Sequence, residues 1–529
     1  MVLTLALAML AQPLQASACP ELEPAIAALD GQVRCLTPAI RAAWLQAHTT
    51  EQRACVAQAM AERGLPSRPM APGRAVDGAR APLPELGVRD SFGLPNQSFS
   101  EHFVLLWGDG RDVSSSQIDM LLGAFEDAWD NHIDGWGMPA PDGTDEYYFN
   151  VYVGDSGSGA PGISGAAGYF TTDDDGHPII VMDPSLLGYR EYASTTAVHE
   201  FFHACQWATD HYVTYESMWF WEATATWSEP VVYPSYDDYA GPLAGFAFLP
   251  HLPLHFFDYP DRGVLQELHH YGAFIWPRYL SEFVADDELT IDVWKAGTAG
   301  ADPLYYYDDY IYRASGLELM DVWGDFLGHN AVWDYQDRQL YLSVLNQYDN
   351  YYTDESLAGT CSGAGMENWS SARENLPQNM GANYLVISEP LEGVLRLELE
   401  LAPRGSFDSL SEWEIRVVPV VDGAWEYVDV PVEGGVASWA SDGTVQYDAV
   451  YVAVGAWAAT WYEEETFDYS YRLWVEGAFP DTGLTDDTGE PEEPGLCGCS
   501  TPPSVAGVAW LGLLGLGALV RRRRGSPTT

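Results

Sequence analysis

One stretch of the chain, residues 195–229, constrains the fold more than any other part of the sequence. It reads TTAVHEFFHACQWATDHYVTYESMWFWEATATWSE and contains the pattern His-Glu-x-x-His. Four residues of α-helix turn the chain by about 400°, so His199 and His203 point the same way, one turn apart. Two imidazoles on one helical face can hold a divalent metal ion, and Glu200 beside them is placed to take a proton from water. Because the surrounding residues are almost all apolar, the pattern predicts a buried helix with a metal site.

A second apolar segment with a single acid in its middle follows at residues 219–227 (WFWEATATW). Between His203 and Glu222 lie 18 residues, which is enough to leave the first helix, turn and return antiparallel to it. Glu222 is therefore the preferred third ligand. Glu216 is the rival, but its polar neighbours are typical of a helix N-terminus, where an acid is favoured for a different reason.

The order HExxH, 18 residues and Glu resembles that of the gluzincin metallopeptidases, whose third zinc ligand is a Glu on the following helix. The resemblance implies that His199, His203 and Glu222 bind Zn²⁺ and that Glu200 is the general base. Without the resemblance, a plainer interpretation stays open: the same side chains could form only hydrogen bonds in the core of a buried helix.

Two more polar residues lie on the helical face of Glu222. Thr226 is at position i+4 and Glu229 at i+7, and either could orient a ligating histidine from behind.

A zinc hydrolase also needs a donor that stabilises the oxyanion of the tetrahedral intermediate. In gluzincins a Tyr or His downstream of the third ligand has this role. The apolar helical segment HHYGAFIW, residues 269–276, offers Tyr271 as the first candidate and His270 as the second. The alternative is that Tyr271 only packs between helices.

Charge and composition exclude some classes of function. The chain has 529 residues, a net charge of −53 and Lys295 as its single lysine, so a nucleic-acid partner is excluded. Hydrophobic residues make up 47 %, enough for a large core in two or three domains. Three consecutive acids in the segment TTDDDGH, residues 171–177, raise the alternative of a Ca²⁺ site, but a hairpin turn is the better interpretation.

Both ends of the sequence predict export. Residues 1–18 are an apolar run that ends in Ala-Ser-Ala, typical of a secretory signal peptide. Cys19, Cys35 and Cys55 follow, and one disulfide among them is expected in an exported chain, with the pairing left open.

At the other end, residues 477–494 form an acidic linker and residues 495–529 contain two cysteines, a 16-residue apolar run and four arginines. Sixteen residues are fewer than the roughly 20 that a membrane-spanning helix needs, and the arginines would stay cytoplasmic. This arrangement resembles the MYXO-CTERM sorting tail of myxobacterial surface proteins. The resemblance implies recognition at the Cys by a sorting enzyme, removal of the tail and retention at the cell surface. The alternative is an ordinary C-terminal membrane segment.

Changes of pattern divide the rest of the chain. Residues 19–90 are predicted to be a helical pro-segment and linker, or a plain helical domain. Residues 91–350 place predicted strands and a helix before the motif helix, the usual zincin order with a sheet above the cleft and helices below. Residues 351–374 are polar and predict a linker, and the period of two in residues 375–476 predicts an antiparallel β-sandwich. The predicted fold is an α+β zincin-like metallopeptidase domain followed by an antiparallel β-sandwich domain.

The layout of residues 90–475, with HEFFHACQ, WFWEATATW and HHYGAFIW in this order, resembles a family of myxobacterial surface metalloproteases. The sequence therefore predicts a zinc endopeptidase that is secreted or retained at the cell surface and acts on protein or peptide substrates. Two other classes stay open. One is a surface adhesive or binding protein with a non-catalytic zinc site. The other is a glycoside hydrolase, for which no pair of acids stands out by its spacing.

Overall fold

The computed structural model describes most of the chain between residues 22 and 476, and one short strand beyond it. The described residues are 22–27, 29, 33–66, 86–163, 165–257, 264–347, 357–362, 366–371, 375–388, 393–401, 411–458, 465–476 and 499–500.

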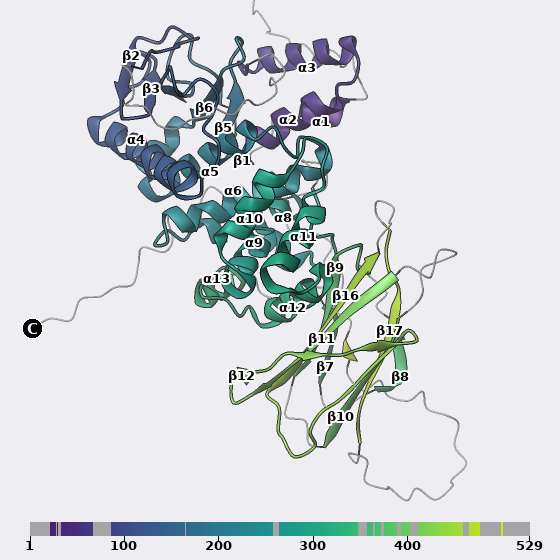
Figure 1. Ribbon diagram of the computed structural model, residues 1–529. Helices are drawn as coiled ribbons and strands as arrows, with labels where there is room; N and C mark the ends of the chain where they lie inside the picture. The colour runs from purple at the N-terminus through teal and green to yellow at the C-terminus, as the bar shows by residue number, and fades with distance from the viewer. Residues whose placement is uncertain are drawn as a thin grey trace, which may run out of the picture.

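A six-stranded mixed sheet forms one end of the molecule (Figure 1). Its strands, given in sequence order, are β1 Val33–Cys35, β2 Asn96–Phe99, β3 Phe103–Trp107, β4 Phe149–Val153, β5 Ala166–Thr172 and β6 Pro178–Met182. In space the order is β1-β5-β6-β4-β3-β2. β3, β4 and β6 run parallel, β5 runs antiparallel to β6, and β1 adds parallel to β5 at the edge. β4, β5 and β6 are buried at every position, as expected for a sheet that is covered on both faces.

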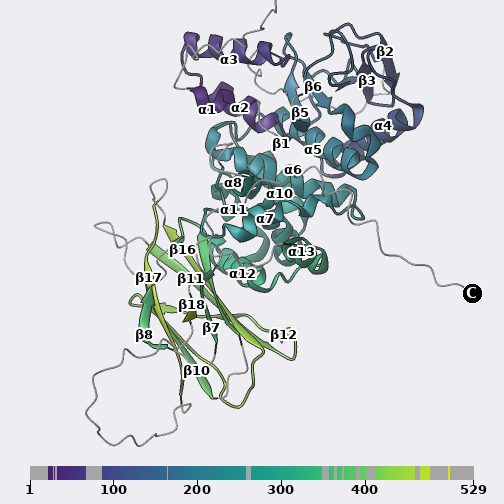
Figure 2. The same cartoon turned by 180° about the vertical axis from the view of Figure 1, so that it is seen from behind.

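Alternate residues of the strands face two different cores. Phe103 and Leu105 share a core with α4 (Ser115–Trp129) and α5 (Arg190–Ala208). Val104 and Leu106, between and after them in β3, share the second core with α1 (Glu23–Ala27), α2 (Thr37–Gln46) and α3 (Thr50–Glu62). The N-terminal segment therefore covers the sheet face opposite the motif helix, and Figure 2 shows it from behind.

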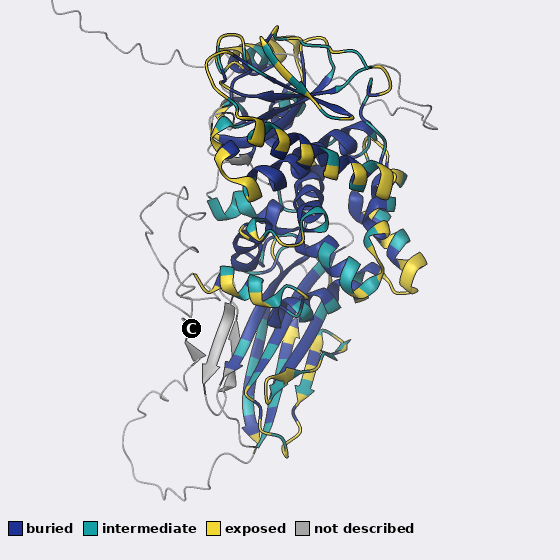
Figure 3. Cartoon of the chain, turned by 90° about the vertical axis from the view of Figure 1, so that its left-hand side faces the viewer, coloured by how far each residue is buried: buried dark blue, intermediate teal, exposed yellow. Residues whose placement is uncertain are grey.

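A layer of helices lies beneath the sheet. Its members are α6 (Met218–Val232), α7 (Leu243–Phe248), α8 (Val264–Gly272), α9 (Ile275–Tyr279), α10 (Asp287–Ala296), α11 (Pro303–Ser315), α12 (Leu319–Val332) and α13 (Arg338–Leu345). α6 packs against both α5 and α8. Figure 3 shows that burial is concentrated in the strands of the sheet and in the helices directly below it, with exposed positions on the outer surfaces.

The remaining strands form a β-sandwich at the far end. They are β7 (Leu357–Ser362), β8 (Met366–Ser371), β9 (Gly381–Ser388), β10 (Val394–Leu401), β11 (Ser411–Val421), β12 (Ala424–Trp425), β13 (Val428–Asp429), β14 (Val432–Glu433), β15 (Val436–Ala440), β16 (Ala449–Ala458), β17 (Tyr469–Glu476) and β18 (Cys499–Ser500). One sheet has the order β14-β15-β10-β17-β8, and the other β12-β11-β16-β9-β7-β18, with β13 beside β11. Both sheets contribute to one apolar core, and α12 packs on β11 and β16.

The structure confirms a mixed α+β fold with antiparallel sheets, and it departs from the sequence prediction in two places. The predicted linker at residues 351–374 contains two strands, β7 and β8. They were not predicted because neither strand has the alternation of apolar and polar residues that marks the others. The N-terminal segment contributes β1 as well as helices, and three residues are too few for a recognisable strand pattern.

Cys55 is disulfide-bonded, whereas Cys35 and Cys205 are free, buried thiols. The predicted signal peptide, the acidic linker and all of the predicted sorting tail except residues 499–500 lie outside the described residues. Within the described part of the chain, no helix combines the length and the hydropathy needed to cross a membrane.

Candidate metal centre

α5 carries the two motif histidines into the core. From Ala193 to Ala208 every residue of this helix is buried, because apolar side chains surround the motif on all faces. The rings of His199 and His203 have centroids 4.7 Å apart and stand at 89° to each other. The prediction that both imidazoles lie on one side of a buried helix is confirmed.

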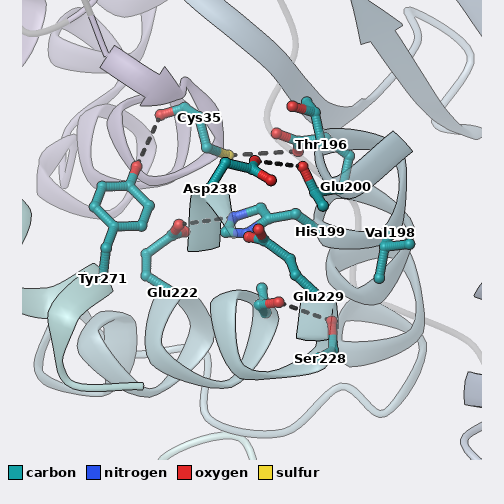
Figure 4. A network of polar contacts seen from close by, with 12 residues as sticks. Cys35, Thr196, Val198, His199, Glu200, Glu222, Ser228, Glu229, Asp238 and Tyr271 are labelled. Carbon is teal, nitrogen blue, oxygen red and sulfur yellow. Dashed lines mark hydrogen bonds and ion pairs between the residues drawn. The ribbon is translucent and has the colours of Figure 1, made fainter. Parts of the chain in front are cut away.

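Glu222 of α6 lies opposite this pair, and Figure 4 shows its carboxylate pointing toward His199. Its two carboxylate oxygens lie 3.2 Å from Nε2 of His199 and 3.2 Å from Nε2 of His203. All three side chains are fully buried. The rival acid, Glu216, is exposed in the short turn of residues 215–217 and is not part of the group.

Each imidazole is held from behind by a second polar side chain. Nδ1 of His199 lies 2.9 Å from Oε1 of Glu229, so of the two residues expected for this role it is Glu229 that contacts a histidine. The Thr226 hydroxyl has no hydrogen-bond partner. Nδ1 of His203 lies 2.7 Å from Oε1 of Gln206, a residue that the sequence analysis missed. The sequence signal that could have identified Gln206 is its position three residues after His203 on an otherwise apolar helix.

Gln206 is itself fixed by α6. Its Nε2 donates to the carbonyl oxygen of Trp221 and to Oγ1 of Thr224, both at 3.0 Å. The amide orientation is thereby set, and Oε1 is left to accept a hydrogen bond from Nδ1–H of His203. That tautomer leaves Nε2 free for a metal ion.

A fourth potential ligand comes from the N-terminal segment. The Cys35 sulfur and the ligand atoms of His199, His203 and Glu222 all lie within 4.8 Å of one another. In the described part of the chain this is the one cluster of His, Cys, Asp and Glu side chains that could hold a metal ion. The sequence predicts Cys35 only as a disulfide candidate, because no pattern links residues so far apart along the chain.

Glu200 lies beside the group and has two contacts from the same N-terminal segment. Its Oε2 accepts from Sγ of Cys35 at 3.4 Å and from Oγ1 of Thr37 at 3.2 Å. Room for this carboxylate comes from Gly168 in β5, where an added Cβ would approach Cγ of Glu200 to 3.0 Å. Thr37 is a second contact that no sequence pattern predicted.

Burial and mutual contact shift the pKa values of the group in opposite directions. Burial raises the pKa of Glu200 and of the Cys35 thiol. The pKa of Glu222 is lowered, since the charge of His203 and the hydrogen bond from His199 outweigh burial. Burial lowers the pKa of His199, but the contacts with Glu222 and Glu229 prevail and raise it to about 9. A bound divalent cation would favour the thiolate of Cys35, because coordinating thiols lose their proton.

The two candidates for the oxyanion donor are both buried on α8. The Tyr271 hydroxyl donates to the backbone carbonyl of Cys35 at 3.3 Å, next to the ligand group (Figure 4). His270 has its ring centroid 4.5 Å from that of Tyr271, and burial lowers its pKa to about 4. Tyr271 is therefore the candidate that already contacts a peptide carbonyl.

The group fits a metal ion because some of its buried polar atoms have no hydrogen-bond partner. Nε2 of His203 and Oε1 of Glu222 face each other at 3.2 Å without hydrogen-bond geometry, and Oε1 of Glu200 has no hydrogen-bond partner. Buried polar atoms without partners cost free energy, and a cation would satisfy those of His203 and Glu222 together.

The acidic loop at residues 171–177 is the turn of the β5–β6 hairpin, which confirms the hairpin interpretation. Oδ1 of Asp173 accepts the backbone N–H groups of Asp175 at 3.0 Å and of His177 at 2.8 Å. This carboxylate oxygen stabilises its own turn, so the Ca²⁺ alternative gains no support from the structure.

Comparison with known proteins gives a family without a function. No protein with curated annotation matches the chain. Residues 89–439 match the model of DUF6055, a family of unknown function, and this range includes α5, α6 and α8 with the predicted ligands and catalytic residues. Because the match spans more than half of its 529 residues, the chain belongs to the DUF6055 family.

Proposed function

We propose that this chain is a zinc-dependent endopeptidase that hydrolyses peptide bonds in protein or peptide substrates. One observation carries the proposal: His199, His203 and Glu222 converge in a buried site, with Glu200 alongside. Two imidazoles and a carboxylate are a ligand set of hydrolytic zinc sites, and a glutamate next to the first histidine is their usual general base.

The choice of Zn²⁺ follows from the chemistry of the donors. Imidazole nitrogen, thiolate sulfur and carboxylate oxygen in a four-ligand group suit Zn²⁺, whereas Mg²⁺ and Ca²⁺ prefer oxygen ligands alone. The fold supports the same assignment, because a mixed sheet lies over the helix that carries the motif. We therefore assign residues 91–350 to a zincin-like catalytic domain.

In this proposal each side chain has a defined part in catalysis. A bound zinc ion supplies Lewis-acid chemistry that polarises a carbonyl and acidifies water. Glu200 accepts the proton of the attacking water and passes it to the leaving amine. The Tyr271 hydroxyl stabilises the oxyanion, with His270 as the second candidate. Glu229 and Gln206 hold the two imidazoles in orientation.

We further propose that the protein is exported and retained at the cell surface. The apolar residues 1–18 support a signal peptide, and the Cys-containing residues 495–529 support either a sorting tail or a C-terminal membrane segment. The large excess of acidic side chains suits an exported, soluble body.

Paired substitutions test the catalytic assignment. Glu200→Gln should keep the metal and lower the rate of casein cleavage by about 10²–10⁴-fold, the usual contribution of a general base. Glu222→Ala should lose the metal and the activity together. Glu216→Gln, which changes the exposed rival acid, is the matched control and should keep both. The proposal fails if Glu200→Gln and Glu222→Ala cleave casein at the parental rate.

A second candidate function is favoured by one observation. With Cys35 the group has four ligands, and a closed set of four is typical of a structural zinc site. A surface adhesive or binding protein would keep such a site without catalysis. It would bind one metal ion per chain and cleave no member of a peptide library, with or without a chelator.

A further inference from the structure

We propose that Cys35 is the fourth metal ligand and that the segment around it, residues 33–37, keeps the catalytic site latent. The inference rests on the proposed peptidase function and names the regulation of that same site. It starts from the position of Cys35, whose sulfur joins the ligand atoms of α5 and α6 although it lies 164 residues before His199 in the chain.

The Cys35 sulfur occupies the place that catalysis needs. A catalytic zinc site has three protein ligands and leaves the fourth position to water, whereas four protein ligands close the site. The sulfur completes the set of four and also lies 3.4 Å from Oε2 of Glu200, the oxygen that would accept a proton from that water. Oγ1 of Thr37 donates to the same oxygen at 3.2 Å. The segment therefore blocks both the ligand position and the general base.

The backbone of the segment occupies the place of a substrate as well. β1 pairs with β5 through Cys35 and Gly168, and the N–H of Leu36 donates to the carbonyl of Gly168 at 3.1 Å. Without β1, β5 would be the edge strand beside the metal site, and extended peptides bind by adding a strand to such an edge. The Tyr271 hydroxyl, which we propose stabilises the oxyanion formed from the scissile carbonyl, here donates to the carbonyl of Cys35.

The segment is anchored firmly enough to persist. α2 and α3, which follow it directly, share a buried apolar core with one face of the sheet. Arg41 of α2 is buried, and its guanidinium carbon lies 3.5 Å from the centroid of the Trp221 ring in α6, next to Glu222. Packing thus fixes the N-terminal segment against both the sheet and α6, so latency does not depend on the Cys35 sulfur alone.

Opening the site is a ligand exchange without electron transfer. With a metal held by His199, His203 and Glu222, opening would release the Cys35 sulfur as a thiol that takes one proton from solvent, and would leave the fourth ligand position to water. Glu200 is then free to accept a proton. The structure thus describes a latent protein whose catalytic residues are already assembled.

The test uses the full chain loaded with Co²⁺ in place of zinc. A thiolate ligand gives a charge-transfer absorption in the near ultraviolet, which is a readout separate from activity. The wild-type protein should show this absorption, and Cys205→Ala, the matched variant of the other free, buried cysteine, should show it too. Cys35→Ala should bind one Co²⁺ per chain without it.

Casein cleavage by the zinc-loaded protein supplies the second readout. Cys35→Ala should exceed the wild type by about tenfold or more, because only the open fraction of the wild type can react. Adding Glu200→Gln to Cys35→Ala should abolish the gain.

Each contrary result has a separate meaning. Absence of the charge-transfer absorption in the wild type overturns the ligand assignment, and this measurement holds even if Cys35→Ala does not fold. Loss of the metal from Cys35→Ala, or cleavage no faster than wild type, overturns latency and makes Cys35 a structural ligand. If casein cleavage persists in Glu200→Gln whatever residue stands at position 35, it is the proposed peptidase site that is wrong.

Discussion

Two of the regions in which the described part of the chain buries charge differ in how completely partners within the protein compensate for it. At the contact of α12 with the β-sandwich, the guanidinium of Arg416 meets three carboxylates at 2.8 to 3.0 Å, those of Asp325, Glu414 and Asp429. At the contact of α5 with α6, the carboxylate of Glu222 contacts two imidazoles, and the buried guanidinium of Arg41 adds an electrostatic interaction. In the first set, called the complete set below, no buried polar atom lacks a partner within the chain. The second set, called the incomplete set, leaves polar atoms without partners.

This difference separates a structural contact from a functional one. Buried charges are tolerated when partners within the protein compensate for lost hydration. Arg416 satisfies that condition, and it joins the helical layer to the sandwich. The group around Glu222 leaves Nε2 of His203 and Oε1 of Glu222 without hydrogen-bond partners even with the charge of Arg41 nearby, and a bound metal ion would satisfy both atoms. The comparison predicts that damage to one set leaves the other intact.

The largest effect is expected from removing the cation of the complete set. Arg416→Met leaves three carboxylates close together, and because two of them are about half exposed or more, the cost should be about 2–3 kcal/mol of unfolding free energy rather than the larger value of fully buried pairs. Denaturant unfolding measures it. Metal content should be unchanged, because the two sets lie in different contacts.

Arg396→Met is the matched control within the same sandwich. The pair of Arg396 with Glu476 is solvent-exposed, so its loss should cost only about 0–1 kcal/mol. An equal cost for both arginines would remove the distinction between a buried complete set and an ordinary surface pair. Loss of metal from Arg416→Met would show that the two regions are coupled.

A second effect of similar size is a loss of unfolding free energy at low pH. His132 packs against the rings of Phe202 and Trp136 beneath α5, and burial lowers its pKa to about 3. Because the unfolded chain binds the proton near pH 6.5 and the folded chain does not, stability is lost as the pH falls below about 6.5. The loss from this group should reach about 2 kcal/mol at pH 5. The sandwich, residues 375–476, contains no histidine and has no such contribution.

The measurement compares His132→Phe with the wild type by urea unfolding at pH 7 and pH 5. Metal release at low pH affects both proteins alike, so the difference between them isolates His132. His48→Gln changes an exposed histidine and serves as the control. A difference between wild type and His132→Phe that stayed constant over this pH range would contradict the assignment of acid sensitivity to this ring.

The metal site shows how far local patterns reach. His199, His203, Glu222 and Glu229 could be predicted because helical spacing fixes which residues share a face. Cys35 and Thr37 could not, because their contacts with Glu200 span 165 and 163 residues and arise from the pairing of β1 with β5. No local periodicity carries information on such a contact.

The same limit applies to the strands. Period-two alternation identified β10 and β17, whose buried and less buried positions alternate regularly. The hairpin of β14 and β15 was missed although its signal was present. Gly434 and Gly435 both have positive φ, 62° and 81°, as a two-residue turn between strands requires. β7 and β8 lack any such signal and are defined by their neighbours in the sheets.

The smallest predicted effect tests whether the incomplete set is tuned for a metal. Glu229 contacts Nδ1 of His199, and as a carboxylate it fixes the tautomer and makes the opposite nitrogen a better donor. Glu229→Gln keeps the size of the side chain and removes the charge, so zinc affinity should fall by about tenfold or somewhat more. Competition with a chromophoric chelator measures the change. Thr226→Val alters the same helical face at a hydroxyl with no hydrogen-bond partner and should leave affinity unchanged. Equal affinities for Glu229→Gln and the wild type would mean that Glu229 is only a buried acid paired with a histidine, like the carboxylates around Arg416. The contrast between a complete and an incomplete set would then rest on Glu222 alone.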